Sequence, residues 1–124
     1  MPKLIALIRK QPQLSRAEFA AYYEANHAPL VARLLPMVSR YARNYLPDEP
    51  AVVGKGEKPA FDVLTELWFE NDADLAAFWE RIREPDVMAA IREDETHFLI
   101  SDATVMYQVD EATTAPGPGS TPAG

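Results

Sequence analysis

The sequence predicts an α+β domain in which one antiparallel sheet carries helices on a single face. Two observations lead to this fold class. Extended and helical segments follow one another in the order strand, helix, strand, strand, helix, strand. The chain has 124 residues, of which 48% are hydrophobic, so it can fill one core and leaves no room for a second domain.

The chain should open with a buried strand and a capped helix. Residues 3–9 form an almost continuous apolar run, which is typical of a strand covered on both faces. Ser15 and Glu18 have the spacing of a capping box, so a helix should begin there. The apolar stripe of this helix extends to about His27.

Prolines divide the next part of the chain. We expect Pro29 to break the first helix and to lie in the first turn of a second one, roughly 29–35, which Pro36 ends. Residues 38–46 alternate as a strand, and the stretch 47–60 is rich enough in proline and glycine to be an irregular loop.

The second half repeats the strand and helix pattern. Residues 61–69 form the clearest strand, and Asn71 or Asp72 should cap the following helix. Pro85 interrupts that helix, and residues 103–109 are the last strand. The helical region buries an apolar face made of Leu75, Phe78, Trp79 and Ile82, then Val87, Met88 and Ile91, toward Phe98.

This order predicts a ferredoxin-like βαββαβ sandwich over residues 1–109. The tail 110–124 is rich in Ala, Thr, Pro and Gly and is expected to be disordered. The strands at 3–9 and 61–69 are too apolar for a sheet with one wet face, so the open face should pack against a second copy. A homodimer with a two-fold interface follows as the expectation.

Composition limits the possible partners. The net charge of −7 argues against nucleic-acid binding, because phosphate contacts need clustered Lys and Arg. No apolar run reaches the length of a membrane span, and the first residues lack the features of a signal peptide, so we expect a cytoplasmic protein without membrane contact. The absence of cysteine excludes disulfides, thiolate metal sites and a cysteine nucleophile.

His27 is the first candidate for chemistry. It follows Phe19 and Tyr23 at four-residue spacing, and Leu30 comes three residues later, so its imidazole should point into the core. A partly desolvated histidine can act as acid, base or hydrogen-bond donor near neutral pH. The alternative is a histidine that only satisfies hydrogen bonds at the proline kink.

Several segments together resemble the EthD family of dimeric α/β-barrel proteins, over about residues 3–109. They are the first strand and helix, the Tyr-Tyr-x-x-x-His-Ala-Pro-Leu segment that begins at Tyr22, the strand Tyr-Ala-Arg-Asn-Tyr and the strand Phe-Asp-Val-Leu-Thr-Glu-Leu-Trp-Phe. The resemblance implies ferredoxin-like protomers paired sheet to sheet, each with a small cavity between sheet and helices. Superfamily relatives include polyketide cyclases, dehydratases, decarboxylases, isomerases, cofactor-free monooxygenases and haem enzymes, so the fold does not settle the chemistry.

The family pattern matches at His27, Asp62 and Glu66, which are the candidate catalytic residues. Asp62 and Glu66 lie four residues apart on one strand face, about 13 Å along the strand, so separate roles are expected. In one arrangement Glu66 bonds to His27 or to an arginine while the imidazole faces substrate. The alternatives are a structural salt bridge of Glu66 with Arg40 or Arg43, and a purely structural Asp62 at the start of the strand.

Aromatic side chains supply the candidate substrate-binding residues. Tyr22, Tyr23, Tyr41, Tyr45 and Trp68, with Arg43, could line a pocket for an aromatic molecule, although packing in the core and at the interface is the favoured explanation of the aromatics. Arg43 and Asn44 point to opposite faces of their strand, so at most one of them can reach a given cavity.

No cofactor or metal site is expected. His27 and His97 are the only histidines, and they lie in different helical regions without metal-binding spacing. The acidic residues beside His97 are interpreted as a solvated helix face. No glycine-rich phosphate loop and no serine nucleophile motif is present.

The leading hypothesis is a small cofactor-independent enzyme that binds a hydrophobic, aromatic or polyketide-like molecule. It would perform proton-transfer chemistry such as dehydration, cyclisation or isomerisation, with His27 as acid or base. A cofactor-free oxygenase and a non-catalytic, small-molecule-binding accessory dimer are the alternatives.

Overall fold

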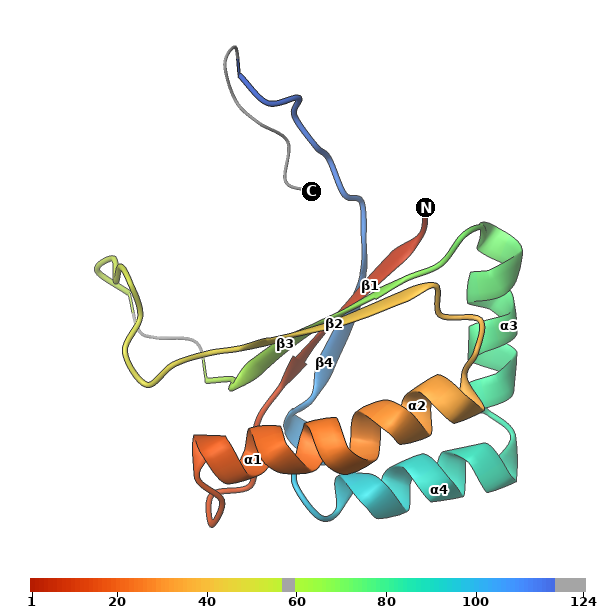
Figure 1. The fold of residues 1–124 in the computed structure, drawn as a ribbon, viewed down its shortest axis with the longest axis horizontal. Helices are drawn as coiled ribbons and strands as arrows, with labels where there is room; N and C mark the ends of the chain where they lie inside the picture. The colour runs from red at the N-terminus through yellow and green to blue at the C-terminus, as the bar shows by residue number, and fades with distance from the viewer. Residues whose placement is uncertain (57–59, 118–124) are drawn as a thin grey trace.

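A four-stranded antiparallel sheet with helices on one face forms the fold in the computed structural model, which describes residues 1–56 and 60–117 (Figure 1). The predicted ferredoxin-like fold class is confirmed. The elements in chain order are β1 (Lys3–Ile8), α1 (Arg16–Tyr22), η1 (Tyr23–His27), α2 (Ala28–Leu34), β2 (Arg40–Tyr45), β3 (Val63–Trp68), α3 (Asp72–Ile82), α4 (Pro85–Glu95), η2 (Ser101–Ala103) and β4 (Val105–Val109).

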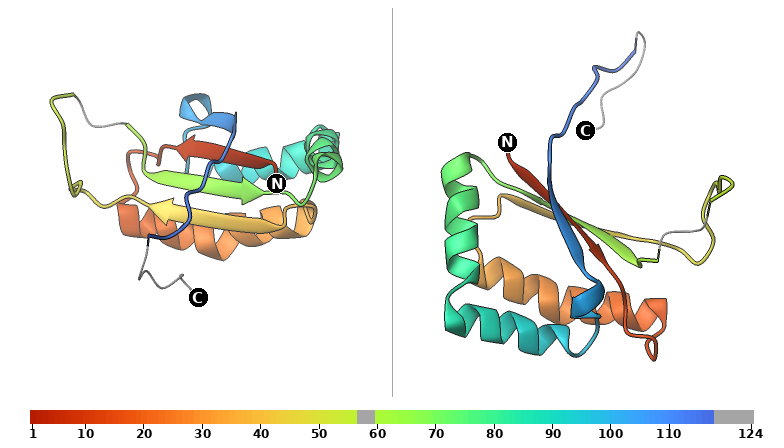
Figure 2. Two further views of the ribbon diagram at one scale, coloured as in Figure 1. Left: turned by 90° about the horizontal axis from the view of Figure 1, so that it is seen from above. Right: turned by 180° about the vertical axis from the view of Figure 1, so that it is seen from behind.

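The strands lie in the order β2-β3-β1-β4. All neighbours are antiparallel, with Ala6 of β1 opposite Thr65 of β3 and Met106 of β4, and Tyr41 of β2 opposite Leu67 of β3. The two most apolar strands, β1 and β3, therefore take the two central positions, where each pairs with a strand on either side. Seen from the open face, the strands lie in front of the helical layer (Figure 2).

Side chains alternate along each strand, so that one set faces the helices and the other set lies on the open face of the sheet. Leu4, Ala6 and Ile8 of β1 are buried under the helices, whereas Ile5 and Leu7 on the other face are only half-buried. Two apolar clusters form the core. One gathers around Phe69 and Phe78, and the other around Phe19, Tyr23 and Phe98.

The helix that begins after Ser15 continues past the expected break. Ser15 and Glu18 form the predicted capping box, with Glu18 N donating to Ser15 Oγ at 3.0 Å and Ser15 N donating to Glu18 Oε1 at 2.9 Å. The expectation that Pro29 breaks the helix is wrong. One π-helical turn, η1, joins α1 to α2, and Ala28 N donates to the carbonyl of Tyr23. Pro29 falls in the first turn of α2, where its missing N–H matters least and where a wider turn relieves the clash of its ring.

The open face of the sheet carries apolar side chains around a charged group. Lys3 Nζ lies 2.7 Å from Glu66 Oε2 and 2.6 Å from Glu111 Oε2, and it stands 4.3 Å above the Trp68 ring. Glu111 belongs to the stretch 110–117, which has no regular secondary structure and is exposed. The domain boundary at residue 109 and the disorder of the tail stay predictions, and residues 118–124 lie outside the described part.

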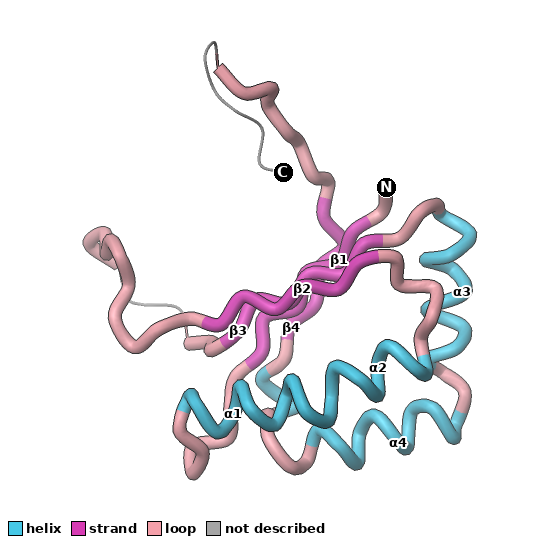
Figure 3. The backbone as a smooth tube through the Cα atoms, in the orientation of Figure 1, coloured by secondary structure: helices cyan, strands magenta, loops and turns pink. Residues whose placement is uncertain are grey.

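The connection between β2 and β3 extends beyond the end of the sheet, and its described residues form no helix or strand (Figure 3). Its base is closed by Leu46 N, which donates to the carbonyl of Asp62 at 3.0 Å. Residues 57–59 of the predicted loop lie outside the described residues. Among the described helices, none combines the length and the apolar character needed to cross a bilayer.

The capping box at Ser15 gives a test of the helix that carries His27. Ser15→Ala removes the acceptor for the backbone N–H of Glu18, so the free energy of unfolding should fall by about 1 kcal/mol. Urea denaturation measures this change. Ser101→Ala is the control, because the Ser101 hydroxyl has no hydrogen bond in the described part of the chain. Equal effects of the two substitutions would contradict the cap's role.

Candidate active site

His27 is buried at the end of the π-helical turn, as the spacing of its helix predicts. Only 5% of the residue is exposed. Its ring packs edge-on against Tyr23, with centroids 5.3 Å apart, and lies 5.0 Å from the Phe98 ring. The turn thus places an ionisable side chain among aromatic rings beneath the sheet.

One ring nitrogen of His27 is held by a carboxylate. His27 Nδ1 lies 2.8 Å from Asp94 Oδ2, on α4. The Tyr22 hydroxyl donates to the other oxygen, Asp94 Oδ1, at 2.7 Å. Burial, and then the Asp94 carboxylate, raise the pKa of Tyr22 to about 12, so it stays a neutral donor. An ionised Asp94 can only accept, and His27 therefore carries a proton on Nδ1.

The other nitrogen, Nε2, faces open space. It makes no hydrogen bond with any described residue. Every fully enclosed side-chain nitrogen or oxygen among these residues has a hydrogen-bond partner, so Nε2 is not fully enclosed. Burial lowers the pKa of His27 more than the neighbouring Asp94 raises it, so the imidazole is neutral at pH 7. With its proton on Nδ1, the ring presents a lone pair at Nε2, which is the arrangement of a general base.

His27 lines a cavity of about 250 Å³ between the sheet and the helices. The cavity lies between the two core clusters, and its wall is mostly apolar. The polar side chains in the wall are Tyr23, His27, Tyr41, Thr65, Arg92, Glu95 and Thr104. A largely apolar cavity with a few polar groups is the usual form of a small-molecule site.

Three hydroxyl groups form a chain along this wall. The Tyr23 hydroxyl lies 2.7 Å from the Tyr41 hydroxyl and 2.9 Å from Thr65 Oγ1. Burial raises the pKa of both phenols, so all three hydroxyls keep their hydrogens. Two internal hydrogen bonds use two of these hydrogens. One hydrogen remains to donate to an oxygen atom of a ligand.

The predicted pair of His27 and Glu66 is wrong. Glu66 lies on the open face of the sheet, because its neighbour Thr65 faces the helices and strand side chains alternate. Its partners are Lys3, at 2.7 Å, and Asn44, whose amide donates to Glu66 Oε1 at 2.8 Å. The alternative salt bridge with Arg40 or Arg43 is not formed either.

Asp62 takes a structural position at the end of the sheet, outside β3. Its carboxylate accepts from Lys10 N at 2.8 Å and lies 3.0 Å from Arg16. It closes the chain around the β2–β3 connection and does not line the His27 cavity. The structural interpretation of Asp62 therefore agrees with its position.

Four of the predicted substrate-binding residues divide between three places. Tyr23 lines the cavity, and Tyr22 stands behind Asp94. Arg43 is on the helix face, where it pairs with Glu24 at 2.7 Å and lies 4.6 Å from the Tyr41 ring, outside the cavity wall. Trp68 is on the open face, between Lys3 and Arg40. Of these four and the three predicted catalytic residues, the structure thus brings only His27, Tyr22 and Tyr23 together.

Asp94 and Glu95 are the residues that the sequence analysis missed. The interpretation of the acidic run as a solvated helix face fits Glu93, whose side chain is 73% exposed, but is wrong for Asp94, which is 14% exposed. A signal was present, because Val87, Ile91, Asp94 and Phe98 are spaced by four, three and four residues. That spacing puts Asp94 on the buried stripe of α4.

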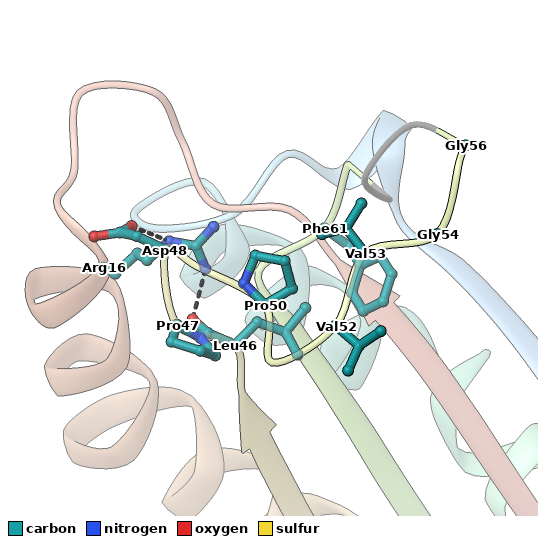
Figure 4. A pocket seen from close by; sticks show the side chains of 10 residues that line it. All are labelled: Arg16, Leu46, Pro47, Asp48, Pro50, Val52, Val53, Gly54, Gly56 and Phe61. Carbon is teal, nitrogen blue, oxygen red and sulfur yellow. Dashed lines mark hydrogen bonds and ion pairs between the residues drawn. The ribbon is translucent and has the colours of Figure 1, made fainter.

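A second hollow, of about 280 Å³, lies at the base of the β2–β3 connection and shares no lining residue with the His27 cavity (Figure 4). Its charged side chains bind each other, since Arg16 Nε lies 2.7 Å from Asp48 Oδ1, and Arg16 also donates to the carbonyl of Leu46 at 2.6 Å. Among the described residues, no group of three or more potential ligands could hold a metal ion.

Comparison with known proteins gives one family and a set of structural relatives. The sequence pattern of the EthD domain family matches residues 11–102. A comparison with curated proteins finds no match. An EthD family protein from Bacillus halodurans has a TM-score of 0.60 at 18% identity, and the match covers 90% of this chain and 100% of that one.

Two further structures have the same fold. SnoaB, a cofactor-independent oxygenase from Streptomyces nogalater, has a TM-score of 0.58 at 12% identity, over 94% of this chain and 97% of its own. A hydroxynitrile lyase from Passiflora edulis has a TM-score of 0.56 at 18% identity, over 91% and 96%. At these identities the similarity shows a shared fold.

The position of Asp94 predicts a large loss of stability when it is removed. Asp94→Ala leaves His27 Nδ1 and the Tyr22 hydroxyl without their acceptor, which should lower the free energy of unfolding by about 3 kcal/mol. Tyr22→Phe should cost only about 1 kcal/mol. Urea denaturation measures both, and the exposed Glu93→Ala serves as control, with a change within about 0.5 kcal/mol. An Asp94→Ala variant as stable as this control would refute the buried pair.

Proposed function

Because the chain belongs to the EthD family, we propose that it is a small enzyme that removes a proton from a hydrophobic molecule held in the His27 cavity. A single observation carries this proposal. His27 is fixed by Asp94 at one nitrogen, its other nitrogen has no hydrogen-bond partner among the described residues, and the residue lines a cavity of about 250 Å³. A histidine that served only the packing of the core would not need that arrangement.

The carboxylate determines what the imidazole can do. Asp94 keeps the proton on Nδ1 and orients the ring, so Nε2 is the nitrogen that accepts a proton from a substrate carbon. When Nε2 becomes protonated, the imidazolium pairs with the Asp94 carboxylate, which stabilises the new positive charge in a buried site. Tyr22 fixes the other carboxylate oxygen and acts through Asp94, as a positioning residue.

The hydroxyl chain supplies the complementary group. When His27 takes a proton from the carbon next to a carbonyl, the electron pair of the C–H bond moves onto the carbonyl oxygen and forms an enolate. The one available hydrogen of the chain formed by Tyr23, Tyr41 and Thr65 can donate to that oxygen. Dehydration, cyclisation and isomerisation all proceed from such an intermediate.

The cavity wall favours hydrophobic substrates. Apart from the polar groups already described, it is built of aliphatic side chains, methionines and Phe78, so an aromatic or polyketide-like molecule suits it. The mechanism uses only side chains of this chain and needs no cofactor or metal. The structural relatives support such chemistry on this fold, since they include a cofactor-independent oxygenase and a hydroxynitrile lyase.

A cofactor-free oxygenase is the second candidate. It would share the first step, because an electron-rich enolate is the species that can react with oxygen. The similarity to SnoaB favours it. Oxygen uptake during turnover separates the two reactions. In a third, non-catalytic function, an accessory dimer would use the cavity only to hold its ligand.

A homodimer is part of the proposal. The open face exposes Tyr107 and Val105, and it carries the half-buried Ile5, Leu7 and Leu64. An apolar sheet face of this kind is commonly covered by another sheet. A second copy, packed sheet to sheet, would leave the His27 cavity on the far side of each protomer.

The proposed base can be tested with 5-nitrobenzisoxazole, an aromatic probe that opens to a coloured cyanophenolate when a base removes its one reactive proton. Turnover should rise with pH through the pKa of His27, which lies below 6.5, and then level off, because the neutral imidazole is the base. His27→Gln should lower kcat/KM at least 100-fold.

His97→Gln is the matched control, since the His97 side chain is 52% exposed, pairs with Glu93 and stacks on the Tyr22 ring without lining the cavity. It should leave the rate unchanged. Turnover that survives in a folded His27→Gln variant would rule out His27 as the base, and absence of turnover by the wild type under saturating probe would favour the accessory dimer.

A further inference from the structure

Glu95 shares the cavity with His27 but has no part in the mechanism described so far. It is the last residue of α4, directly after Asp94, and it lines the cavity. Its side chain makes no hydrogen bond or ion pair with the described residues. Every fully enclosed side-chain oxygen among the described residues has a hydrogen-bond partner. The Glu95 carboxyl group has none, so it is not fully enclosed.

The carboxyl group lies in apolar surroundings. Met88, Ile91 and Met106 line the same cavity. Burial is the main influence on Glu95 and raises its pKa, with Arg92 acting against the rise and Asp94 adding to it. Among the described residues, the charged and titratable groups around it are Arg92 and Asp94 of α4, His27 and Tyr23 of η1, Tyr41 of β2 and Asp102 of η2.

Glu95 also lies where the cavity meets the surface. A third, more polar hollow is lined by Arg92, Glu95 and Thr104, which line the cavity too, together with Thr96, Ser101 and Asp102. The shared residues place this hollow next to the cavity, and we interpret it as the approach to the cavity. Glu95 therefore stands between the apolar interior and solvent, from which it can regain a proton.

Resting on the proposed function, we propose that Glu95 is the acid that complements the base His27, and that the substrates are β-hydroxy carbonyl compounds with a hydrophobic body. The carbonyl oxygen accepts from the hydroxyl chain of Tyr23, Tyr41 and Thr65. The β-hydroxyl group points toward the approach, at Glu95. The reaction is then an elimination of water.

Atoms and electrons balance in this step. The C–H bond breaks, and its proton goes to His27 Nε2. The electron pair of the C–H bond first forms the enolate, and it then forms the new C=C bond while the C–O bond breaks, so that the departing oxygen takes the proton of Glu95 and leaves as water. The imidazolium and the carboxylate that remain exchange a proton through solvent at the approach, which restores both groups without any oxidant or reductant.

The dependence of stability on pH gives the first test, and it needs no substrate. Since the pKa of Glu95 is raised in the folded state, its contribution to stability is complete below about 4.5 and is lost as the pH rises through the folded value. Glu95→Gln should therefore raise Tm at pH 7, by about 3 °C, and not at pH 4. Glu93→Gln, on the exposed face of the same helix, should show no such gain. A Glu95→Gln variant without this gain would overturn the proposal.

The second test varies the leaving group. Benzisoxazole and its 5-nitro derivative lose the same proton, but the phenolate of the unsubstituted compound is much more basic and gains more from an acid. Glu95→Gln should lower kcat/KM at least tenfold for benzisoxazole and less than about threefold for the nitro compound. Equal effects on both probes would overturn the acid role.

The outcomes for the two proposals remain distinct. If His27→Gln abolishes turnover of both probes while Glu95→Gln has no leaving-group effect, the base stands and the acid is refuted. If the wild type shows no turnover that depends on His27, the base is refuted and the acid with it.

Discussion

The hydrogen bond between His27 Nδ1 and Asp94 Oδ2 is the interaction on which the site depends. It joins two segments of the helical layer, since His27 ends the π-helical turn between α1 and α2 and Asp94 lies on α4. It also fixes the tautomer, because a carboxylate can only accept. A packing contact between two helices thereby determines which ring nitrogen carries the proton and which keeps its lone pair. The proline after this turn has a related effect, since the wider backbone turn that accommodates it is the one that ends in His27.

The polar groups of the site are arranged so that burial favours their uncharged forms. Burial lowers the pKa of His27 and raises those of Glu95, Tyr23 and Tyr41. An apolar cavity thus holds a neutral base, neutral donors and a carboxyl group with increased affinity for its proton. Each of these groups also has a cost, because a polar atom left without a partner in such surroundings is destabilising. Groups of this kind are typical of functional sites and unusual in a core built for stability alone.

The sequence predicted the fold and the inward position of His27, because both follow from local periodicity and from a capping box. It did not predict the partner of His27, since side chains distant in sequence meet only through packing. A bond to Glu66 was one of the expected arrangements, yet the alternation along β3 places Glu66 with Lys3 on the other face, and the periodicity alone could not say which face the helices cover. Asp94 could have been found from its spacing to Ile91 and Phe98. The acidic neighbours of Asp94 made the solvated face seem the simpler interpretation.

The protonation state of His27 is the most direct test of this account. Nitrogen-15 NMR of the imidazole, recorded across a pH titration, reports both the tautomer and the pKa. The account predicts a neutral ring at pH 7, with its proton on Nδ1 and a pKa below the ordinary value of about 6.5. An imidazolium at pH 7, or a neutral ring with its proton on Nε2, would contradict it, because neither form offers a base to the cavity.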